Sequence, residues 1–529
     1  MARLFFILFS FLIANTSFAG ESVRSIVVLE GKPLALVEGG EVNNQGLVLQ
    51  ERYTQFEKKL FSTIPAAKIS KDKYFRFSVH AVVVETPRDQ VWRLEFLPSV
   101  KRVEEDRVVT APVVGKPRIV DAVTQATLEE SVEKIGAKNL HNLGVKGKGI
   151  VIAIVDSGID YLHPDLGGGL GPTFKVTLAW NALNNHPGGM DSLGHGTHVA
   201  GIAAGKNGVA PEANLWAIQV LDAKGYGSLS SIVGGIERAI DFDNNPSTPD
   251  RADIINISLG DDAGHPDDIM SEAVDNAVRA GAVVVSAAGN EGPEFETIDS
   301  PGTAALGLAV GAADLKDQIA EWSSIGPVVQ NGTIKPDLIA PGVDITAPFP
   351  RNRYATRSGT SMAAPHVAGA AALLKSANPA LTPSEIKSLL LLSARDLGKS
   401  MFVQGYGMLQ VDLAQTLPVM LPLDGLSWGS MGGKKGKHQG TKNFAVKNLL
   451  PINIEATLAP KGWLKGATLV VSPDRLVLPP NSSNQFALEF SASSEIGNPT
   501  ESSWAYPLPL QISVGDWNRS IPICLVKEQ

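Results

Sequence analysis

Apolar residues in the middle of the chain gather in near-continuous runs of strand length. The runs are Ile150–Val155, Leu215–Val220, Ile254–Leu259 and Val283–Ala287. Such runs suit strands buried on both faces, as in a parallel sheet covered by helices. Helix candidates lie at Ser231–Phe242 and Asp267–Ala280, and the second is followed by Gly281, a good carboxyl-end signal. Alternating elements over about residues 120–415 predict an α/β sandwich with a mostly parallel sheet flanked by helices.

A first unit, residues 20–112, has a different pattern. Phe75–Val84 alternates apolar and polar residues before a β-branched run, which predicts a strand. Val91–Phe96 fits either another strand or a short helix, and residues 100–109 form a third extended segment. These elements predict a small α+β unit with no catalytic constellation of its own.

The last part of the chain changes character again. Short extended runs at Ala467–Val471, Phe486–Phe490 and Leu508–Val514 are separated by Pro, Gly, Asn and Ser. This pattern predicts a small β-sandwich over residues 440–529. The Gly- and Pro-containing residues 418–439 are predicted to link it to the α/β domain, residues 113–417.

An alanine-rich apolar stretch, residues 358–374, reads SGTSMAAPHVAGAAALL. Its small, helix-favouring residues predict a buried helix with Ser361 at the amino end and Pro365 near the first turn. Unpaired N–H groups at such an end would stabilise negative charge beside Ser361. A serine that merely caps a core helix is the alternative, unless a base and its orienting group lie elsewhere in the chain.

The amino terminus is typical of an exported protein. Residues 1–19 have a charged start at Arg3, an apolar run at Leu4–Ile13 and the small-x-small sequence Ser17-Phe18-Ala19. The run is short for a membrane span, so these residues predict a cleaved signal peptide and a secreted protein, extracellular or periplasmic, whose mature chain has no membrane span. Cys524, the single cysteine, excludes an intramolecular disulfide and is predicted to be a core thiol. The net charge of −8 argues against a nucleic-acid partner.

Two candidates for the missing partners of Ser361 stand at element ends. Asp156 follows an apolar strand directly, where ligands gather at the carboxyl edge of a parallel sheet. His195, in GHGTHVAG (194–201), opens a second small-residue helix. A carboxylate at position 156 could orient this histidine, although an aspartate in a strand-to-loop turn is the alternative for Asp156 taken alone.

Asn290 and the remaining histidines complete the list of candidates. Asn290, in SAAGNEG (286–292), could donate its amide to an oxyanion, with turn chemistry as the alternative. A zinc site at His195 and His198 is disfavoured, because zinc helices space histidines four apart with an intervening glutamate. Three further histidines are interpreted as turn or core residues: His163, His186 and His366.

The motifs DSG, HGTHVAG, AAGNEG and GTSMAAPHVAG, in that order, resemble those of the subtilisin-like serine proteases over residues 120–415. The resemblance implies that Ser361 is the nucleophile, His195 the general base and then acid, Asp156 its orienting partner and Asn290 part of the oxyanion hole. It implies hydrolysis of protein or peptide substrates through an acyl-enzyme. It further implies substrate binding by three segments: Gly225-Tyr226-Gly227, Ser258-Leu259-Gly260 and, lining the primary specificity pocket, Ala287-Ala288-Gly289.

The resemblance also gives the flanking units a meaning. Residues 20–112 resemble an inhibitor-type propeptide, which makes the protein a zymogen that is expected to cut itself within residues 108–120. The carboxyl-terminal unit resembles the fibronectin-type sandwiches of some members of the family. The loop of the tight calcium site of the family has no room between Gly201 and Pro211, so no cofactor is expected to be required and no metal ligand is assigned. Calcium binding stays open at Asp241/Asp243 and Asp261/Asp262, which are interpreted first as solvated loops.

Substrate preference is the least defined property. A carboxylate among Glu294, Glu296 and Asp299 at the pocket floor would favour a basic residue before the scissile bond, with surface exposure expected for at least two of the three. Two other functions remain open: a binding protein on an inactive protease scaffold, and a narrow processing enzyme whose β-domain selects one partner. Inactive scaffolds usually lose one of the four catalytic positions, and all four are present here.

Overall fold

The computed structural model describes residues 21–37, 41–111, 114–120, 126–243, 245, 250–262, 264–328, 333–423, 426, 428–431, 438–461, 467–492, 505–507 and 509–527. The chain divides into two compact units, Met1–Arg107 and Val108–Gln529. The predicted signal peptide lies outside the described residues. No helix within the described ranges is long and apolar enough to cross a membrane.

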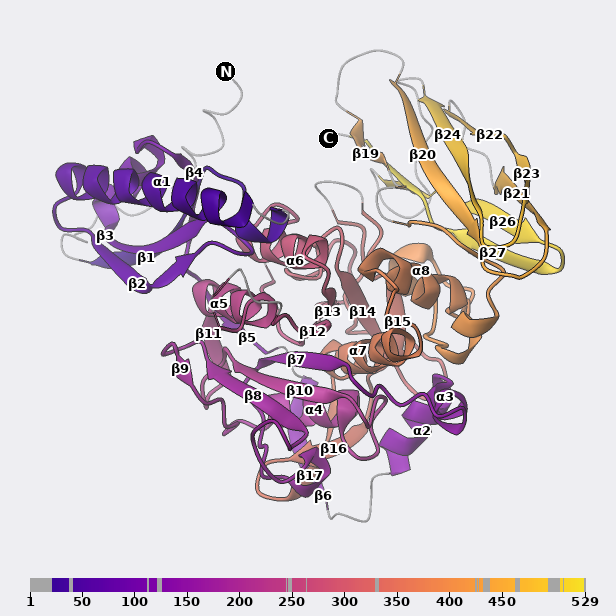
Figure 1. Ribbon diagram of the computed structural model, residues 1–529, viewed down its shortest axis with the longest axis horizontal. Coiled ribbons are helices and arrows are strands. Elements are labelled where there is room, and N and C mark those ends of the chain that lie inside the picture. The colour runs from indigo at the N-terminus through magenta and orange to yellow at the C-terminus, as the bar shows by residue number, and fades with distance from the viewer. Residues whose placement is uncertain are drawn as a thin grey trace. The chain divides into compact units, whose positions relative to one another are not determined.

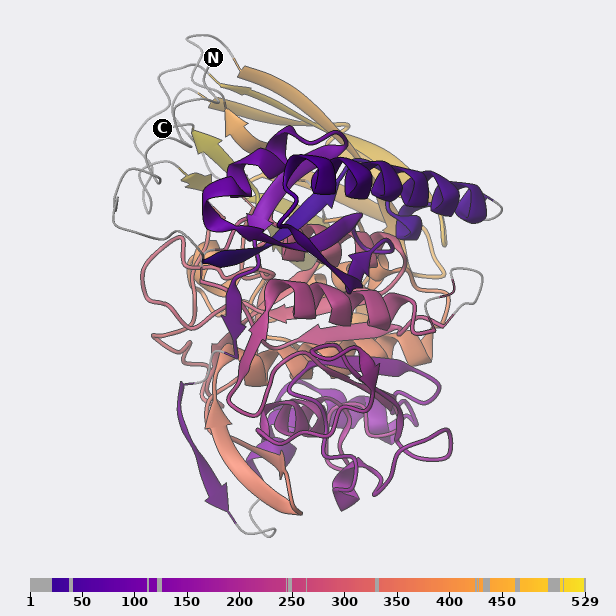
Figure 2. The same ribbon diagram turned by 90° about the vertical axis from the view of Figure 1, so that its left-hand side faces the viewer.

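The first unit is an antiparallel sheet covered by one long helix (Figure 1). The strand order is β2-β3-β1-β4, from strands β1 (Ser22–Leu29), β2 (Lys68–Phe75), β3 (Ala81–Pro87) and β4 (Val100–Glu105). Helix α1 (Val42–Thr63) buries Leu49, Tyr53, Phe56 and Leu60, whose spacing of three and four places them on one face. Figure 2 shows this helix lying along the sheet.

The structure changes the interpretation of two segments in this unit. The segment Phe75–Val84 is not one strand, because residues 76–80 turn between β2 and β3. His80 holds this turn, with its Nδ1 2.9 Å from the Glu30 carbonyl oxygen. The ambiguous segment 91–96 belongs to a 3₁₀ helix, η4 (Arg88–Phe96).

The second unit is built on an eight-stranded sheet of order β15-β14-β13-β12-β7-β10-β8-β9. All its pairings are parallel except that of β8 with β9. The strands are β7 (Val151–Asp156), β8 (Val176–Asn181), β9 (His186–Pro187), β10 (Asn214–Gln219), β12 (Ile254–Ile257), β13 (Val283–Ala287), β14 (Leu308–Ala313) and β15 (Leu338–Pro341). The four apolar runs of the sequence therefore become β7, β10, β12 and β13, and the α/β fold is confirmed.

Helices cover both faces of this sheet. Figure 1 shows α5 (Leu229–Ile240) and α6 (Ile269–Arg279) on one side, and α4 (His195–Ala204) and α7 (Thr360–Ala377) on the other. Every residue of α7 from Thr360 to Leu374 is buried, which explains its alanines and glycine: bulkier side chains would push the helix off the sheet. The remaining helices are α2 (Ala126–Lys134), α3 (Ala137–Asn142), α8 (Pro383–Ser393), α9 (Met401–Gln404), η5 (Pro164–Leu166) and η6 (Asp412–Thr416).

Two small sheets stand beside the main one. Strand β5 (Val108–Thr110) pairs with β11 (Tyr226–Ser228), and β6 (Val114–Val120) joins the hairpin of β16 (Ile345–Phe349) and β17 (Arg353–Ser358). Figure 2 shows β6 running beside this hairpin. The chain segments on either side of residues 112–113 therefore both pair with the α/β domain.

The carboxyl-terminal strands form three sheets, of order β18-β20-β24-β22, β23-β21-β26-β27 and β19-β28-β25. The strands are β18 (Val419–Met420), β19 (Trp428–Met431), β20 (His438–Asn448), β21 (Ile454–Pro460), β22 (Ala467–Ser472), β23 (Arg475–Leu478), β24 (Ser483–Ala492), β25 (Ala505–Pro507), β26 (Leu510–Val514), β27 (Trp517–Ile521) and β28 (Cys524–Lys527). Strands β18 and β19 both lie inside the predicted linker, residues 418–439, of which residues 424, 425, 427 and 432–437 are outside the described residues. The buried residues of these sheets, such as Phe444 and Phe486, belong to the same apolar core as α7 and α8. Within the described residues, these strands therefore share an apolar core with the α/β part.

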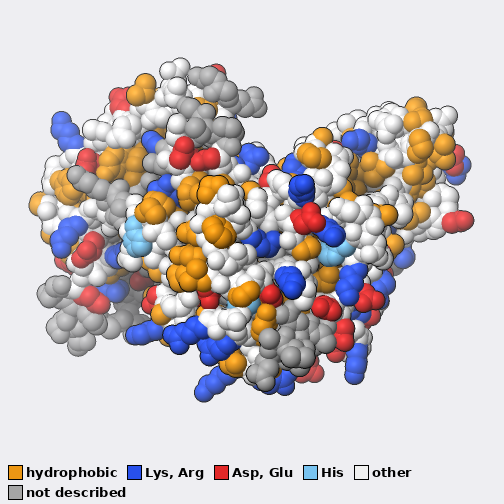
Figure 3. Space-filling model, turned by 60° about the horizontal axis from the view of Figure 1, so that its bottom comes forward, with side chains coloured by type: hydrophobic (Ala, Val, Ile, Leu, Met, Phe, Trp, Pro, Cys, Tyr) orange, Lys and Arg blue, Asp and Glu red, His pale blue; other side chains and the backbone are white. Residues whose placement is uncertain are grey.

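Side chains of both charges are spread over one face of the molecule. On the face drawn in Figure 3, Lys and Arg are interspersed with Asp, Glu and apolar side chains. Cys524 is fully buried against Phe402, Ile325 and Ile334, as expected for a core thiol.

Candidate active site

Asp156 lies at the carboxyl end of β7, in the middle of the main sheet. The strand ends because Gly158 takes a φ of +94°, and a Cβ there would lie 2.2 Å from the carbonyl oxygen of Gly189. The Asp156 side chain is fully buried, and its Oδ1 accepts a hydrogen bond of 2.7 Å from the N–H of Ser157. Its position agrees with the expected location of ligands at the carboxyl edge of a parallel sheet.

His195 is the first residue of α4 and faces this carboxylate. Its Nδ1 lies 2.8 Å from Oδ1 and 2.9 Å from Oδ2 of Asp156. A carboxylate only accepts hydrogen bonds, so Nδ1 carries the proton and Nε2 of the neutral ring is left as an acceptor. This Nε2 is buried and has no hydrogen-bond partner among the described residues. The ring is therefore oriented by one nitrogen and open to chemistry at the other.

Gly196 lets the helix approach the aspartate this closely. A Cβ on Gly196 would lie 2.1 Å from the Gly158 carbonyl oxygen and 3.1 Å from Asp156 Cβ. The Gly196 N–H donates a hydrogen bond to Ser157 Oγ over 2.9 Å. The glycine in HGTH is thus required by the contact between α4 and β7.

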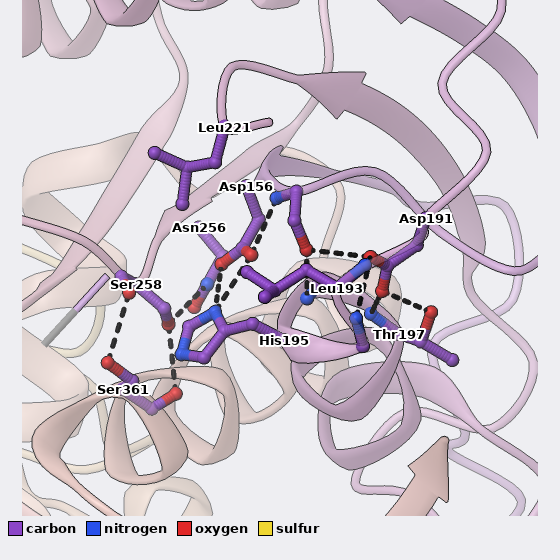
Figure 4. A network of polar contacts seen from close by, with 12 residues as sticks. Asp156, Asp191, Leu193, His195, Thr197, Leu221, Asn256, Ser258 and Ser361 are labelled. Carbon is purple, nitrogen blue, oxygen red and sulfur yellow. Dashed lines mark hydrogen bonds and ion pairs between the residues drawn. The ribbon is translucent and has the colours of Figure 1, made fainter. Parts of the chain in front are cut away.

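A second buried carboxylate, Asp191, holds the start of α4. Its Oδ1 accepts hydrogen bonds from Ser157 Oγ and from the N–H groups of Leu193 and Gly194, at 2.8–2.9 Å. Its Oδ2 accepts from the N–H of Thr197 at 2.9 Å and from Thr197 Oγ1 at 2.6 Å. Burial raises the pKa of Asp191, and the hydrogen bonds from Gly194 and Thr197 oppose this. Ser157 links the two acids, because its Oγ donates to Asp191 and its N–H donates to Asp156; Figure 4 shows Asp191 and Asp156 within this network.

Ser361 occupies the second position of α7 and is fully buried. Its Oγ donates to the Ser258 carbonyl oxygen over 3.0 Å, and Ser258 Oγ donates back to the Ser361 carbonyl oxygen over 2.9 Å. Figure 4 shows the imidazole of His195 between Asp156 and Ser361. In this rotamer the serine hydroxyl is bonded to the carbonyl group rather than to His195 Nε2. The structure thus brings the three predicted side chains together, with the hydroxyl–imidazole hydrogen bond not made.

Asn290 lies in the loop after β13 and contacts the residue before Ser361. Its Oδ1 accepts hydrogen bonds of 3.0 Å from both the N–H and the Oγ1 of Thr360. The amide oxygen is therefore directed to the start of α7, which leaves the N–H₂ as the donor group of this side chain. Thr360 could not be predicted from the sequence as the anchor of Asn290, because the contact joins residues 70 positions apart.

The two predicted edge segments both contact the chain's own strand β5. Tyr226, Gly227 and Ser228 pair with Thr110, Val109 and Val108 in antiparallel register. On its other side Thr110 forms a bridge with Gly260, whose N–H donates to the Thr110 carbonyl oxygen over 3.4 Å. Residues 108–110 thus form a strand between the two segments.

The chain continues from this strand past the serine. Val114, the first residue of β6, pairs with Ser358, three residues before Ser361. The two residues that make these pairings, Thr110 with Gly260 and Val114 with Ser358, are therefore only four positions apart in the chain. Residues 112–113 lie outside the described residues.

Ala287-Ala288-Gly289, the predicted pocket segment, packs against a buried acid. Asp299 is 3% exposed, its N–H donates to the Ala288 carbonyl oxygen over 2.9 Å, and a Cβ on Gly289 would lie 2.7 Å from Asp299 Cγ. Oδ1 of Asp299 is buried without a hydrogen-bond partner among the described residues. Burial, and then the charge of Glu291, raise the pKa of Asp299 well above its usual value. Glu294 and Glu296 are exposed, as expected for two of the three acids of this segment.

Neither His198 nor His366 is arranged as a metal ligand. Nε2 of His198 lies 3.1 and 2.9 Å from the carbonyl oxygens of Ile345 and Ala355, and burial lowers its pKa to about 3, with a further contribution from Arg357. His366 contacts the Met362 carbonyl oxygen and Ser131 Oγ. These two are core histidines, His163 caps η5, and His186 lies exposed at a strand end.

Two of the four acids interpreted as solvated are buried, which corrects that expectation. Asp241 is 4% exposed because it ends α5 against the protein, and Asp261 is 8% exposed because its backbone pairs with Ser300. Asp243 and Asp262 are exposed.

Comparison with known proteins identifies the class. The sequence profile of the subtilase family matches residues 147–408, which include Asp156, His195, Asn290 and Ser361. The chain belongs to this family, and it is a subtilisin-like serine endopeptidase, a hydrolase.

The matches to individual relatives extend over most of the length of each relative. Subtilisin NAT of Bacillus subtilis subsp. natto is 37% identical over 350 residues, 65% of this chain and 82% of the relative. The alkaline protease of Alkalihalobacillus alcalophilus is 33% identical over 378 residues, 69% of this chain and 89% of the relative. Serine protease AprX of Bacillus subtilis (strain 168) is 40% identical over 302 residues, 50% of this chain and 66% of the relative.

Proposed function

We propose that the hydrolysis runs through an acyl-enzyme on Ser361. A rotation about the Cα–Cβ bond of Ser361 moves Oγ from the Ser258 carbonyl to His195 Nε2. As Oγ attacks the substrate carbonyl carbon, Nε2 takes its proton, and Asp156 stabilises the imidazolium through Nδ1–H. Nε2 then returns the proton to the leaving amine, and water repeats the sequence to release the acyl group. The single observation that carries this proposal is the buried, unpartnered Nε2 on a ring that Asp156 orients.

The negative charge on the substrate oxygen requires its own donors. The N–H of Ser361 at the start of α7 and the N–H₂ of Asn290 are the proposed pair, supported by the contacts that direct the Asn290 oxygen to Thr360. Donors held in place before the reaction stabilise the charge without reorganising, and the loss of one costs about 10²–10³ in kcat.

We further propose that the protein is made as an exported, inhibited precursor. Residues 1–19 would direct export, and residues 20–112 would act as a propeptide whose end fills the substrate site. The pairing of residues 108–110 with Tyr226–Ser228 and Gly260 supports this, since substrates are expected to add a strand at these same edges. The maturation bond then lies between Thr110 and Val114, within the expected range of 108–120.

The substrate class is proposed to be proteins with a basic residue before the scissile bond. Asp299 supplies the argument, because a buried carboxylate oxygen without a partner beside Gly289 and Gly260 would be satisfied by a cationic side chain. The chain's own segment 108–114 needs no such residue, since its attachment holds it at the site.

One pair of proteins tests the proposed chemistry and maturation together. The wild type and Ser361→Ala are expressed, and the products are compared by amino-terminal sequencing and peptide hydrolysis. The wild type is expected to begin within residues 111–114 and to be active. Ser361→Ala should keep its first unit and lose activity by on the order of 10⁴-fold or more. Equal trimming of both proteins would refute self-maturation, and retained activity in Ser361→Ala would refute the nucleophile.

Asp156→Asn separates a catalytic role of the acid from a structural one. Its shape is kept, so the fold and the binding of substrate should be retained while kcat falls by about 10⁴-fold, because the asparagine favours the wrong imidazole tautomer. The Ser361→Ala and Asp156→Asn proteins also test the alternative of an inactive binding scaffold. For such a scaffold, neither substitution would change any measured property.

A further inference from the structure

A cluster of three carboxylates lies at the far end of α5, outside the active site. Asp241 follows the last residue of this helix, and Asp243 and Asp250 belong to the connection that leads to β12. Each of the three offers one oxygen, and these oxygens lie within 4.8 Å of one another. Like charges at this separation repel, so their convergence needs a compensating partner.

The buried oxygens of the cluster lack that partner. Asp241 is 4% exposed, and its Oδ2 is buried with no hydrogen-bond partner among the described residues; the same holds for Oδ1 of Asp250. The other oxygens of these two acids are used, since Asp241 Oδ1 accepts from the N–H of Asn245 at 2.9 Å and Asp250 Oδ2 from that of Asp243 at 2.7 Å. A buried carboxylate oxygen without a donor is costly and is rarely left so in a folded protein.

Arg238, a cation whose charge interacts with all three acids, does not supply the missing partner. Arg238, one turn back on α5, lies over the ring of Trp180 at 3.9 Å and donates its Nη1 to the Phe242 carbonyl oxygen over 2.7 Å. Its guanidinium lowers the repulsion among the three acids but makes no hydrogen bond to the two unpartnered oxygens.

We propose that Asp241, Asp243 and Asp250 bind a divalent cation of the calcium type. The ligands are all oxygens, whereas zinc prefers nitrogen and sulfur ligands, so this set of ligands disfavours zinc. Calcium accepts six to eight oxygens in an adaptable geometry and can complete its shell with backbone carbonyls and water, whereas magnesium demands a near-octahedral set. The site is distinct from the one whose loop is missing between Gly201 and Pro211.

The position of the site gives the ion a structural role. Helix α5 starts directly after β11, and β12 runs into Ser258–Gly260, so the connection between them joins both substrate-binding edges. An ion held by residues 241, 243 and 250 fastens the end of α5 to the segment that leads into β12. Binding to the native state alone raises stability by mass action.

Calcium binding by the full-length Ser361→Ala protein, freed of metal with a chelator, tests the site. Calorimetric titration with CaCl₂ is compared between this protein and its Asp243→Asn derivative. Asp243 is exposed, and asparagine keeps its shape, so the fold should be retained. The derivative is expected to lose one equivalent of calcium, or to bind it at least 10-fold more weakly, together with the calcium-induced rise in Tm. Asp314→Asn is the matched control, because Asp314, like Asp243, accepts turn N–H groups but has no carboxylate cluster around it in the described part of the chain.

Terbium luminescence locates the ion independently of stability. The ring of Phe242 lies 5.1 Å from Trp216 and 6.2 Å from Trp180, so an ion at Asp241 and Asp243 is close to two indoles that can sensitise Tb³⁺. Excitation of tryptophan should give terbium emission that CaCl₂ competes away, that is lost in Asp243→Asn and that falls in Trp216→Phe. Equal calcium stoichiometry, affinity and terbium emission in Asp243→Asn and Asp314→Asn would overturn the proposal.

Discussion

Single contacts decide what each acid near the active site can do. Asp156, Asp191 and Asp299 are all buried, yet they meet different partners. Asp156 faces an imidazole, Asp191 accepts five hydrogen bonds from the start of α4 and from Ser157, and one oxygen of Asp299 has no partner within the described ranges. A buried carboxylate whose oxygens all accept hydrogen bonds stabilises the local structure. A buried carboxylate with an oxygen that accepts none is a candidate for binding a ligand.

Asp299→Asn should therefore change which peptides are cleaved. We expect kcat/KM for peptides with Lys or Arg before the scissile bond to fall by about 10- to 100-fold relative to peptides with Leu there, because the charged partner of the side chain is lost. The ratio is measured with matched peptides on the mature enzyme. Glu294→Gln removes an exposed carboxylate from the same segment and should leave the ratio unchanged. Equal cleavage of basic and apolar peptides by the wild type would remove the proposed preference, while leaving the proposed catalytic residues untouched.

At the scale of elements, the two buried helices α4 and α7 each carry a histidine that must stay neutral. Burial lowers the pKa of His366 to about 4 and, together with Arg357, lowers that of His198 to about 3. In the unfolded chain both side chains titrate near 6.5. Between these values the unfolded state binds more protons than the native state, so stability is lost as the pH falls below about 6.5.

His366→Gln should flatten this loss. In the Ser361→Ala background, which avoids self-digestion, the unfolding free energy is measured with urea at several pH values from 7 to 4.5. Removing one titrating group should reduce the slope by up to about 1.4 kcal/mol per pH unit in this range, whatever the substitution does to stability at pH 7. Parallel pH profiles for the two proteins would contradict the assignment of His366 as a neutral core residue.

Elements whose character is set locally were predictable from the sequence. Val283–Ala287 is continuously apolar because both faces of the strand are buried, and the strand has these bounds in the structure. The capping box at Thr382 and Glu385 opens α8, since it needs only side chains and N–H groups within one turn. The long helix α1 was missed because its four buried residues are spread among polar ones.

The rest depended on contacts between distant parts of the chain. Phe75–Val84 looked like one strand because its alternation continues through the turn held by His80. Asp191 was overlooked because its role rests on Ser157, 34 positions away, although an acid shortly before the HGTH helix was a signal that could have been used. Asn290 could be suggested from its motif, but its anchor on Thr360 could not.

At the scale of the whole molecule, the α/β domain and the carboxyl-terminal strands share one apolar core. Polar contacts join them too: Lys447 Nζ lies 3.3 Å from Glu385 Oε1, and Arg519, on β27, donates to the carbonyl oxygens of Leu392 and Ala394 at the end of α8. These carbonyls have no partner within their own helix, so a cation there both satisfies them and meets the negative end of the helix dipole. Deleting residues 420–529 would therefore expose buried surface of the catalytic part, and a single substitution is the cleaner probe of the connection.

Arg519→Ala should loosen α8 without touching the active site. Hydrogen exchange followed by mass spectrometry is expected to show the last turn of α8 and strand β27 exchanging roughly 3- to 10-fold faster in the Ser361→Ala background, because half-buried hydrogen bonds to a charged group are lost. Arg475→Ala is the control: its ion pair with Glu455 lies at the surface, 51–65% exposed, and such pairs contribute little. If both substitutions left hydrogen exchange in α8 unchanged, the carboxyl-terminal strands would be a separable domain. Selection of a protein partner would then be the better explanation of why the protease carries these strands.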